Sequence, residues 1–470
     1  MQSLAWPQMP SPDSRPRWRR GLIAAGVALV VVVAAGVAFV LLHKPGNVSH
    51  PSISFTTTST PTTTSAPPKR AVAVDNFLWP RYGYDAARNR DFDGPHDLAP
   101  PFRVGWIHHD YALLEFPPDI YKTALYYMND GGWVKEVDAL NGKQIWETHV
   151  GNLTAATPAI GLHQGLLYVP VLSTNGSSPG NGRFLALSMK NGRIKWSIPI
   201  AAGTESSPIA WGNTVYFGDQ AGNVYSVNAR TGHVNWTFHA SGSVKGGPAY
   251  SDGRLYFGDY AGRAYCIDAN NGHQVWAVST NGAADGFGSG NFYSTPAVAF
   301  GRVYMGNTDG FVYSFAAGTG ALAWSTSTGA YVYASPAVAD VPGLGPTVYM
   351  GSYSGNFYAF NAQSGAIRWS HPAGGKISGS ATIVNNVVYY SDLATRTTSG
   401  LNLRTGQQVF SYPDGGFSPI VADESAIFLV GYNTLYELLP KSRAASPRKS
   451  SKPTVKTASG KRARSRHKRK

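Results

Sequence analysis

The 470-residue chain contains very little cysteine and little charge. Its single cysteine, Cys266, excludes an intramolecular disulfide and any metal centre built from several thiolates. Because Cys266 lies in the alternating run AYCID, we expect a small buried apolar side chain rather than a reactive thiol. The chain also lacks a P-loop and zinc-ligand spacing. What it has instead is glycine, with 53 residues, and only 14% charged residues, which suits short strands joined by tight turns.

The formal net charge of +14 is confined to the ends of the chain. Residues 441–470 contain 13 lysines and arginines and no acidic residue, whereas the body, residues 71–440, contains 20 basic and 25 acidic residues. The body therefore lacks the excess of positive charge that a phosphate-binding face needs, and nucleic acid is not its expected ligand. We predict a disordered basic tail over 441–470. Its partner would be an anionic wall polymer or another polyanion, and the alternative is a solvated tail that raises solubility.

One long apolar run, residues 21–42, predicts a transmembrane anchor. Its 22 uncharged residues would rise roughly 33 Å as a helix, enough to cross the hydrocarbon core of a bilayer. The run is longer than the apolar stretch of a cleaved signal peptide and no clear cleavage site follows it. Four arginines in the basic arm 1–20 precede it, so the positive-inside rule places this arm in the cytoplasm. We expect a single-pass protein of the cell membrane whose later residues are extracytoplasmic.

Residues 43–75 are rich in serine, threonine and proline. The stretch PSISFTTTSTPTTTSAPP at 51–68 is typical of an extended segment that cannot bury a core. We therefore predict a stalk over 43–75 and a folded body over 76–440.

A short pattern recurs along the body. VNARTGHVNW at 227–236 is followed by IDANNGHQVW at 267–276, and similar copies end in an aromatic residue every 40 to 50 residues. Each unit holds four short alternating segments that end in Gly, Asn or Asp, which indicates four antiparallel strands. A period of this length indicates a propeller or a solenoid. The recurring aromatics are Trp106, Trp146, Trp196, Trp236, Trp276, Trp324, Trp369 and Phe410.

The number and closure of the units follow from a separate count of strands. Both the first strands and the second strands of the units number eight. The last unit stops after three strands and has no tryptophan, whereas Trp106 precedes the first complete unit. We predict an all-β, eight-bladed propeller of four-stranded blades, in which the N-terminal strand completes the C-terminal blade and leaves no open edge between the first and last blades.

We interpret the repeat as structural. The glycine before each aromatic, such as Gly232, occupies a hairpin position that needs a left-handed residue. The tryptophan on the next strand is large and flat, so it can dock between adjacent twisted blades.

The pattern A-x-D/N-x-x-T/N/S-G-x-x-x-W resembles the tryptophan-docking motif of the pyrroloquinoline-quinone (PQQ) repeat propellers. Residues 78–90, LWPRYGYDAARNR, are similar to the segment that opens such domains, and the resemblance covers roughly 76–440. Members of this family include quinoprotein dehydrogenases, the propeller lipoprotein of the bacterial outer-membrane assembly machine, and sensor domains outside membrane kinases. The resemblance therefore implies the fold without deciding whether PQQ is bound.

Propellers bind ligands at the mouth of the central channel, where the loops that enter the innermost strands converge. Two enlarged glycine-rich loops, 173–183 and 281–292, lie on this face. The alternative to a ligand site is that Glu205 and Lys245 pair with each other and that tyrosine rings plug the channel. The channel-mouth candidates for a polar ligand or a peptide are Glu115, Glu205, Lys245, Tyr293 and Tyr333.

We interpret the protein as a membrane-anchored scaffold or sensor that binds a protein, a peptide or an envelope component, with no catalytic residue, metal or cofactor expected. The alternative is a PQQ-dependent alcohol or sugar dehydrogenase. The resemblance implies that such an enzyme would hold PQQ with Ca²⁺ and often a vicinal disulfide, which one cysteine cannot form. Calcium prefers six to eight oxygen ligands, and Glu115, Glu205 and Asp285 are scattered along the sequence.

Overall fold

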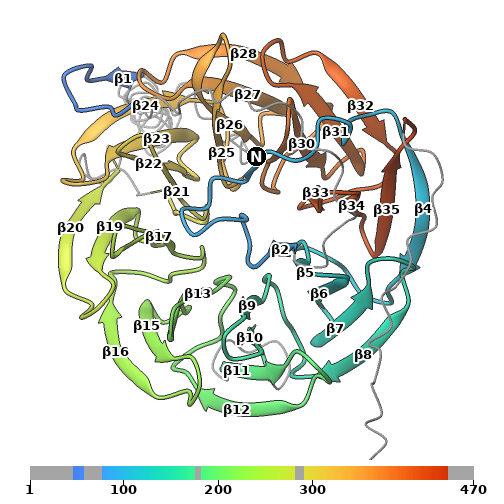
Figure 1. Ribbon diagram of the computed structural model, residues 1–470. Coiled ribbons are helices and arrows are strands. Elements are labelled where there is room, and N and C mark those ends of the chain that lie inside the picture. Colours follow the sequence, from blue (N-terminus) through green and yellow to red (C-terminus); the bar gives the residue numbers. More distant parts are fainter. Residues whose placement is uncertain (1–45, 58–76, 175–181, 281–289, 443–470) are drawn as a thin grey trace, which may run out of the picture. The chain divides into compact units, whose positions relative to one another are not determined.

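The computed structural model describes residues 46–57, 77–174, 182–280 and 290–442. From Val48 onward, the described strands form eight sheets arranged as blades around a central axis (Figure 1). This confirms the predicted all-β, eight-bladed propeller. The predicted arm 1–20, the predicted span 21–42 and nearly all of the predicted tail lie outside the described residues. Among the residues that are described, no helix is long and apolar enough to cross a bilayer.

Blades 1 to 4 each follow the chain from the axis to the rim. Blade 1 contains β5 (Asp119–Tyr121), β6 (Ala124–Asn129), β7 (Trp133–Asp138) and β8 (Gln144–His149); blade 2 contains β9 (Ala159–Gly161), β10 (Leu166–Val171), β11 (Arg183–Ser188) and β12 (Ile194–Pro199); blade 3 contains β13 (Ile209–Trp211), β14 (Thr214–Gly218), β15 (Asn223–Asn228) and β16 (Val234–His239); blade 4 contains β17 (Ala249–Ser251), β18 (Arg254–Gly258), β19 (Arg263–Asp268) and β20 (Gln274–Ser279).

Blades 5 to 7 repeat this order, and blade 8 differs. Blade 5 contains β21 (Ala297–Ala299), β22 (Arg302–Gly306), β23 (Phe311–Ala316) and β24 (Leu322–Ser327); blade 6 contains β25 (Ala337–Val341), β26 (Gly345–Gly351), β27 (Asn356–Asn361) and β28 (Ile367–Pro372); blade 7 contains β29 (Thr382–Val384), β30 (Val387–Asp392), β31 (Thr397–Asn402) and β32 (Gln408–Tyr412); blade 8 contains β33 (Ile420–Ala422), β34 (Ile427–Val430), β35 (Thr434–Pro440) and, as its outer strand, β4 (Phe102–His109).

The ring closes as the sequence predicts. Strand β4, which precedes blade 1 in the chain, pairs antiparallel with the last described strand, β35, with Thr434 opposite His109. Three sheets carry a fifth strand from the N-terminal part of the chain: β1 (Val48–Ser49) on blade 5, β2 (Leu78–Trp79) on blade 1 and β3 (Asp91–Phe92) on blade 7.

The hydrophobic core lies in layers between neighbouring blades. Phe184 of blade 2 stacks on Phe217 of blade 3, with ring centroids 3.8 Å apart. The middle strands are covered on both faces, so β10 is buried at every position, whereas the outer strand β16 alternates between exposed and half-buried residues. Cys266 lies in one of these layers and is fully buried, as expected.

Each outer-strand tryptophan docks on the blade that follows it. The indole N–H of Trp196 donates to the carbonyl oxygen of Ala229 at 3.2 Å, and the ring covers Gly232 in the same turn. The seven tryptophans all make this hydrogen bond, at 2.9–3.2 Å. The turn glycines have φ of +67° to +78°, and a Cβ there would lie 2.5–2.9 Å from the indole. These positions therefore need glycine both for backbone conformation and for ring contact.

Phe410 occupies the position of an eighth docking tryptophan. The closure of the ring by β4 and β35 explains why the residue is not tryptophan. Phe410 is on the outer strand of blade 7, so its docking partner would be the turn between the third and fourth strands of blade 8. Those strands, β35 and β4, come from opposite ends of the propeller and no turn joins them. Without that turn, an indole N–H would have no equivalent carbonyl to meet, and Phe410 packs edge-on against Phe102 of the closing strand, with centroids 5.6 Å apart.

Residues 77–92, here called the strap, run through the centre of the ring beside the innermost strands (Figure 1). Arg88 is fully buried and donates to the carbonyl oxygens of Ser207 (2.8 Å), Pro248 (3.1 Å) and Tyr82. Further bonds between the strap and the inner strands join Phe77 to Lys122, Pro80 to Ile160, Arg81 to Ala210, Ala86 to Tyr250, Ala87 to Val298, Asn89 to Val338 and Arg90 to Ile383. The strap thus contacts blades 1 to 7, reaching blade 3 through the Arg81 and Arg88 guanidiniums and the other six through its own carbonyl oxygens.

Residues 48–57, which fall within the predicted stalk, pack on blade 5. Strand β1 pairs with the outer strand β24. The buried Arg302 donates to the carbonyl oxygens of Ile53 at 2.5 Å and Ser54 at 2.8 Å, and Phe55 stacks on Phe300 with centroids 5.5 Å apart. Strand pairing, the Arg302 hydrogen bonds and the packing of Ile53 and Phe55 together attach this part of the segment to the propeller.

The docking interaction predicts a difference between two glycine substitutions. Gly253→Ala introduces a Cβ into open space at φ +75°, so it should lose only about 1–2 kcal/mol of unfolding free energy from backbone strain. Gly232→Ala adds a contact of 2.9 Å with the Trp196 ring at nearly the same φ, and should lose about 1–3 kcal/mol more. Denaturant unfolding of both variants measures the difference. Equal losses would show that the docked ring does not restrict the turn.

Candidate functional site

A pocket of about 180 Å³ opens at the mouth of the central channel. It lies on the face where loops lead from the outer strand of one blade to the inner strand of the next. Its volume is below the roughly 300–1,000 Å³ of pockets that enclose drug-sized ligands, so it has room for one side chain or a similar group. The structure brings the five residues predicted from the sequence together around this opening: Glu115, Glu205, Lys245, Tyr293 and Tyr333.

Residues outside the sequence-based prediction form the floor of the pocket. Tyr82 of the strap lies there, and its hydroxyl is hydrogen-bonded to that of Ser380. The backbone N–H of Thr295 donates to the Ser335 hydroxyl at 3.0 Å, and the N–H of Ser335 donates to the Ser380 hydroxyl at 3.2 Å. These hydroxyls join neighbouring blades around the channel. The sequence signal was a Ser or Thr directly before the first strand of most blades, also seen at Thr157, Ser207 and Ser418.

Glu205 is the best-satisfied charge at the mouth. Its Oε1 lies 2.9 Å from the Lys245 ammonium and accepts from the Gln220 amide at 2.6 Å, and its Oε2 accepts from the Tyr293 hydroxyl at 3.0 Å. The ammonium of Lys245 also lies 5.1 Å from the centre of the Tyr260 ring. The pairing of Glu205 with Lys245, predicted as the alternative to a ligand site, is therefore present, and it occupies both oxygens of Glu205.

Glu115 is the contrasting charge. It is half-buried, and its carboxylate makes no hydrogen bond or ion pair with the described residues. Burial, and after it the negative charge of Glu205, raise the pKa of Glu115 to about 7. Burial and the neighbouring Glu115 likewise raise the pKa of Asp130 to about 7. The mouth therefore holds an acidic side whose charge no described basic residue balances.

Five tyrosines form an arc along the rim of the mouth. Consecutive ring centroids are 6.3 Å apart from Tyr260 to Tyr293, 5.6 Å from Tyr293 to Tyr333 and 4.9 Å from Tyr333 to Tyr353. The arc ends at Tyr331, whose side chain is 53% exposed. It provides an aromatic surface that continues from the pocket to solvent.

The residues at the mouth do not fit PQQ with calcium. Both oxygens of Glu205 are occupied, which leaves Glu115 as the other carboxylate among the described pocket residues, far short of six to eight oxygen ligands. No group of three or more His, Cys, Asp or Glu within the described ranges could hold a metal ion. PQQ is a polycarboxylate, and Lys245, the basic residue that lines the pocket, is already paired.

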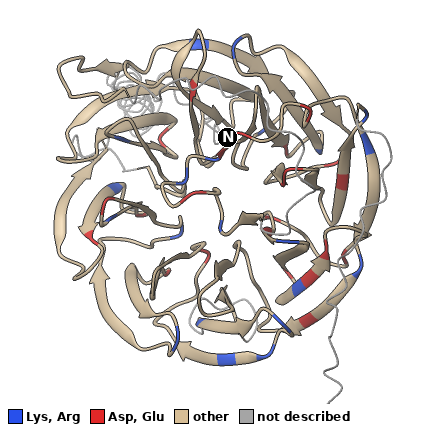
Figure 2. Ribbon diagram, viewed as in Figure 1, with Lys and Arg blue, Asp and Glu red and all other residues tan. Residues whose placement is uncertain are grey.

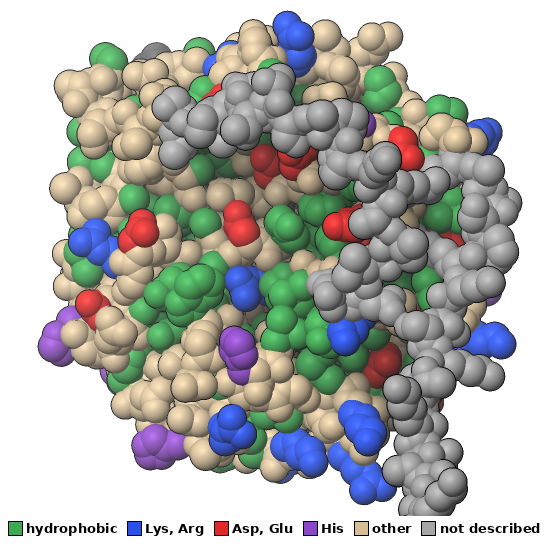
Figure 3. Space-filling model, in the orientation of Figure 1, with side chains coloured by type: hydrophobic (Ala, Val, Ile, Leu, Met, Phe, Trp, Pro, Cys, Tyr) green, Lys and Arg blue, Asp and Glu red, His purple; other side chains and the backbone are tan. Residues whose placement is uncertain are grey.

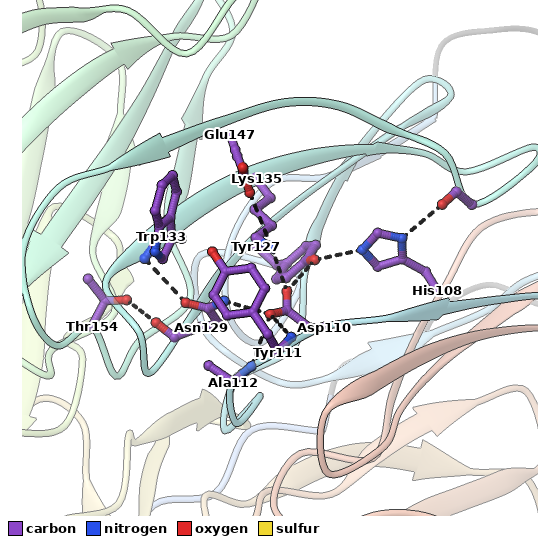
Figure 4. Close-up of polar contacts among 11 residues, drawn as sticks. His108, Asp110, Tyr111, Ala112, Tyr127, Asn129, Trp133, Lys135, Glu147 and Thr154 are labelled. Carbon is purple, nitrogen blue, oxygen red and sulfur yellow. Dashed lines mark hydrogen bonds and ion pairs between the residues drawn. The ribbon is translucent and has the colours of Figure 1, made fainter.

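A second polar cluster is structural and lies at the seam of the ring (Figure 4). Asp110 follows β4 of blade 8 and is bound from blade 1 by the Lys135 ammonium at 3.2 Å, the Tyr127 hydroxyl at 2.7 Å and the Asn129 amide at 2.7 Å. Although burial opposes ionisation, the bond from Tyr127 and the charge of Lys135 lower the pKa of Asp110. His108 joins the cluster through Tyr127, at 3.0 Å. The cluster thus ties the closing strand to the first blade.

Charges of both signs are spread around the propeller in the view of Figure 2. Lys and Arg lie around the ring with Asp and Glu between them, and the face in Figure 3 carries both signs (Figures 2 and 3). On the face that Figure 3 shows, the described residues therefore carry basic and acidic side chains together.

Comparison with known families gives a match over most of the propeller. The family profile described as outer membrane protein assembly factor BamB matches residues 130–244 and 220–446, which together are more than half of the chain. No curated protein sequence matches.

Solved structures show the same fold at low sequence identity. BamB from Moraxella catarrhalis is 15% identical with a TM-score of 0.58, and the match covers 74% of this chain and 100% of that chain. The quinohemoprotein alcohol dehydrogenase ADHIIG from Pseudomonas putida HK5 is 14% identical with a TM-score of 0.65, covering 80% and 82%. The computationally designed Ika8 protein is 13% identical with a TM-score of 0.59, covering 72% and 99%. At these identities the likeness shows the fold alone.

The raised pKa of Glu115 predicts the pH dependence of stability. Between its unfolded pKa near ~4.3 and its folded pKa of about 7, the folded protein holds a proton that the unfolded chain releases, so the unfolding free energy falls as the pH rises through this interval. Glu115→Gln removes the effect. It should be more stable than the wild type at pH 8, by on the order of 1–2 kcal/mol, and equally stable near pH 4.

Thermal unfolding at both pH values measures this, with Asp252→Asn as the control because Asp252 is an exposed acid on the opposite face. Loss of stability in Glu115→Gln at pH 8 would show that the carboxylate is favourably paired after all.

Proposed function

The chain belongs to the PQQ-like repeat β-propeller family, whose profile is described as outer membrane protein assembly factor BamB, and from this membership we propose that it is a binding scaffold or sensor. In this proposal residues 21–42 anchor it in the cell membrane and the propeller lies outside the cytoplasm. A protein or peptide of the cell envelope binds at the channel mouth. The matching family profile, described as an outer membrane protein assembly factor, supports a role in binding protein.

The observation that carries the proposal is the combination of a small pocket and a wide aromatic rim. The pocket has room for one side chain, and the tyrosine arc extends from it to the exposed Tyr331. Tyrosine is enriched at protein interfaces and at the residues that contribute most to binding. A polypeptide could place one side chain in the pocket and rest its neighbours on the arc.

The alternative is a quinoprotein dehydrogenase, since ADHIIG shares the fold. The oxygen donors at this mouth do not support it, because Glu205 is paired and Glu115 is the other carboxylate that lines the pocket. We therefore treat the enzyme as the outcome that would contradict the scaffold.

Site-specific photo-cross-linking in cells tests the binding face. Full-length protein with a photoreactive phenylalanine in place of Tyr331 should give a discrete protein adduct. The same group in place of Trp211, which is 48% exposed at the end of β13 on the opposite face, should not. Adding Glu115→Gln should lower the Tyr331 adduct by about tenfold, as for a residue central to an interface. Equal adducts from both faces would contradict the proposal.

Calorimetric titration of the full-length protein with PQQ and Ca²⁺ provides the complementary control. We expect no heat of binding. Tight one-to-one binding with turnover of alcohols or sugars would replace the scaffold with the enzyme.

The proposed topology can be tested with introduced cysteines. The natural Cys266 is fully buried and burial raises its thiol pKa to about 11, so it should not react. In intact cells an impermeant maleimide should label Gln363→Cys, at an exposed turn of the propeller, and should label Ser14→Cys only after the membrane is opened. Labelling of Ser14→Cys alone in intact cells would show that the chain has the opposite orientation in the membrane.

A further inference from the structure

Each side of the channel mouth has a glutamate beside aromatic rings, Glu205 on one side and Glu115 on the other. Of these two, only Glu205 is paired with a lysine in the described part of the chain. On that side, the Lys245 ammonium lies 2.9 Å from the Glu205 carboxylate and 5.1 Å from the centre of the Tyr260 ring. The Lys245 side chain remains 23% exposed. At this side of the mouth, the Glu205 carboxylate and the face of the Tyr260 ring therefore bind an ammonium group whose side chain is still partly exposed to solvent.

The other side has a carboxyl group without a paired cation from the described ranges, although the Arg90 guanidinium already lies over the Tyr82 ring, 4.5 Å from its centroid. Glu115 lines the pocket beside Phe116 and Tyr82, whose rings meet edge to face with centroids 5.5 Å apart. Tyr293 lies in the field of both Glu205 and Glu115, which, after burial, raise its pKa. Among the described residues no lysine or arginine pairs with Glu115. This side of the pocket thus has a carboxyl group, unpaired by any described cation, beside aromatic rings.

Such a setting selects for positive charge. The negative face of an aromatic ring attracts cations, and the attraction grows when water is partly excluded. A guanidinium is planar and weakly hydrated, stacks on rings and can bind a carboxylate through two hydrogen bonds. A volume of about 180 Å³ admits one such group and little more.

We infer that the pocket at the channel mouth binds an arginine or lysine side chain of a polypeptide, with its cation against Glu115 and beside the aromatic rings that line the pocket. This rests on the proposed binding function and names the chemistry of the residue that is recognised. The tyrosine arc would then contact the residues that flank the inserted side chain.

Two sources could supply this side chain. One is a basic segment of a partner protein. The other is the chain's own C-terminal part, since residues 441–470 contain 13 lysines and arginines. Comparison of the full chain with a chain that ends at residue 442, and so keeps every strand of the ring, distinguishes them.

The experiment is a ligand-observed NMR titration of the full-length protein and of the chain ending at 442. The probe is N-acetyl-arginine amide, and N-acetyl-glutamine amide is the neutral match. We expect a dissociation constant on the order of 1 mM for the arginine probe, as for a ligand of this size, and at least about tenfold weaker binding of the glutamine probe. Glu115→Gln should weaken arginine binding by about tenfold or more, and Glu115→Asp by less.

Asp252→Asn removes the same charge from the opposite face and should leave binding unchanged, which separates a local contact from a general effect of net charge. Binding by both chains supports the inference with a partner as the source. Binding by the shortened chain alone supports it with the chain's own basic tail in the pocket.

Equal binding of the arginine and glutamine probes, or unchanged binding in Glu115→Gln, would overturn the inference. If neither chain binds the probe while the Tyr331 adduct persists, the cation pocket is wrong and the scaffold stands. If the adduct is absent as well, both are wrong.

Discussion

The docking of one tryptophan on the next blade is the interaction on which the rest of the propeller depends. Each indole donates to a backbone carbonyl and covers the turn glycine that precedes the neighbouring outer strand. One residue per unit therefore fixes the distance and the rotation between adjacent sheets. The core layers, the short loops at the mouth and the place of the five mouth residues all follow from that spacing. The exception at Phe410 supports this view, because it occurs where the next blade has no turn.

The strap adds a second constraint from inside the ring. It bonds the inner strands through backbone groups and through buried arginines such as Arg88, and it places Tyr82 beneath the mouth. The outer tryptophans and the inner strap therefore hold each blade at both ends. The charges and rings at the mouth thus lie on a frame that is held at both ends of each blade.

Much of this was visible in the sequence, and what was missed has physical reasons. The period of the aromatic repeat predicted the eight blades and the closure by β4. Because Glu115 and Lys245 each lie three residues before the proline that leads into the first strand of a blade, the sequence also predicted that they share one opening. The unbalanced charge of Glu115 depends on distances between loops of different blades, which no local pattern encodes. The strap bonds mainly through its carbonyl oxygens, which every residue has, so its path left no signature. The docking of residues 48–57 depends on Arg302, far along the chain.

The closure of blade 8 also has a consequence for biosynthesis. His109 and Thr434, which face each other across this closure, are 325 residues apart in the chain. A nascent chain that emerges from its N-terminus therefore carries β4 as an unpaired strand until the final strands have been made. Contacts of such separation form slowly, and an unpaired strand is prone to pair with other chains. The same closure that leaves the finished ring without an open edge makes the newly made chain depend on protection of β4 until synthesis ends.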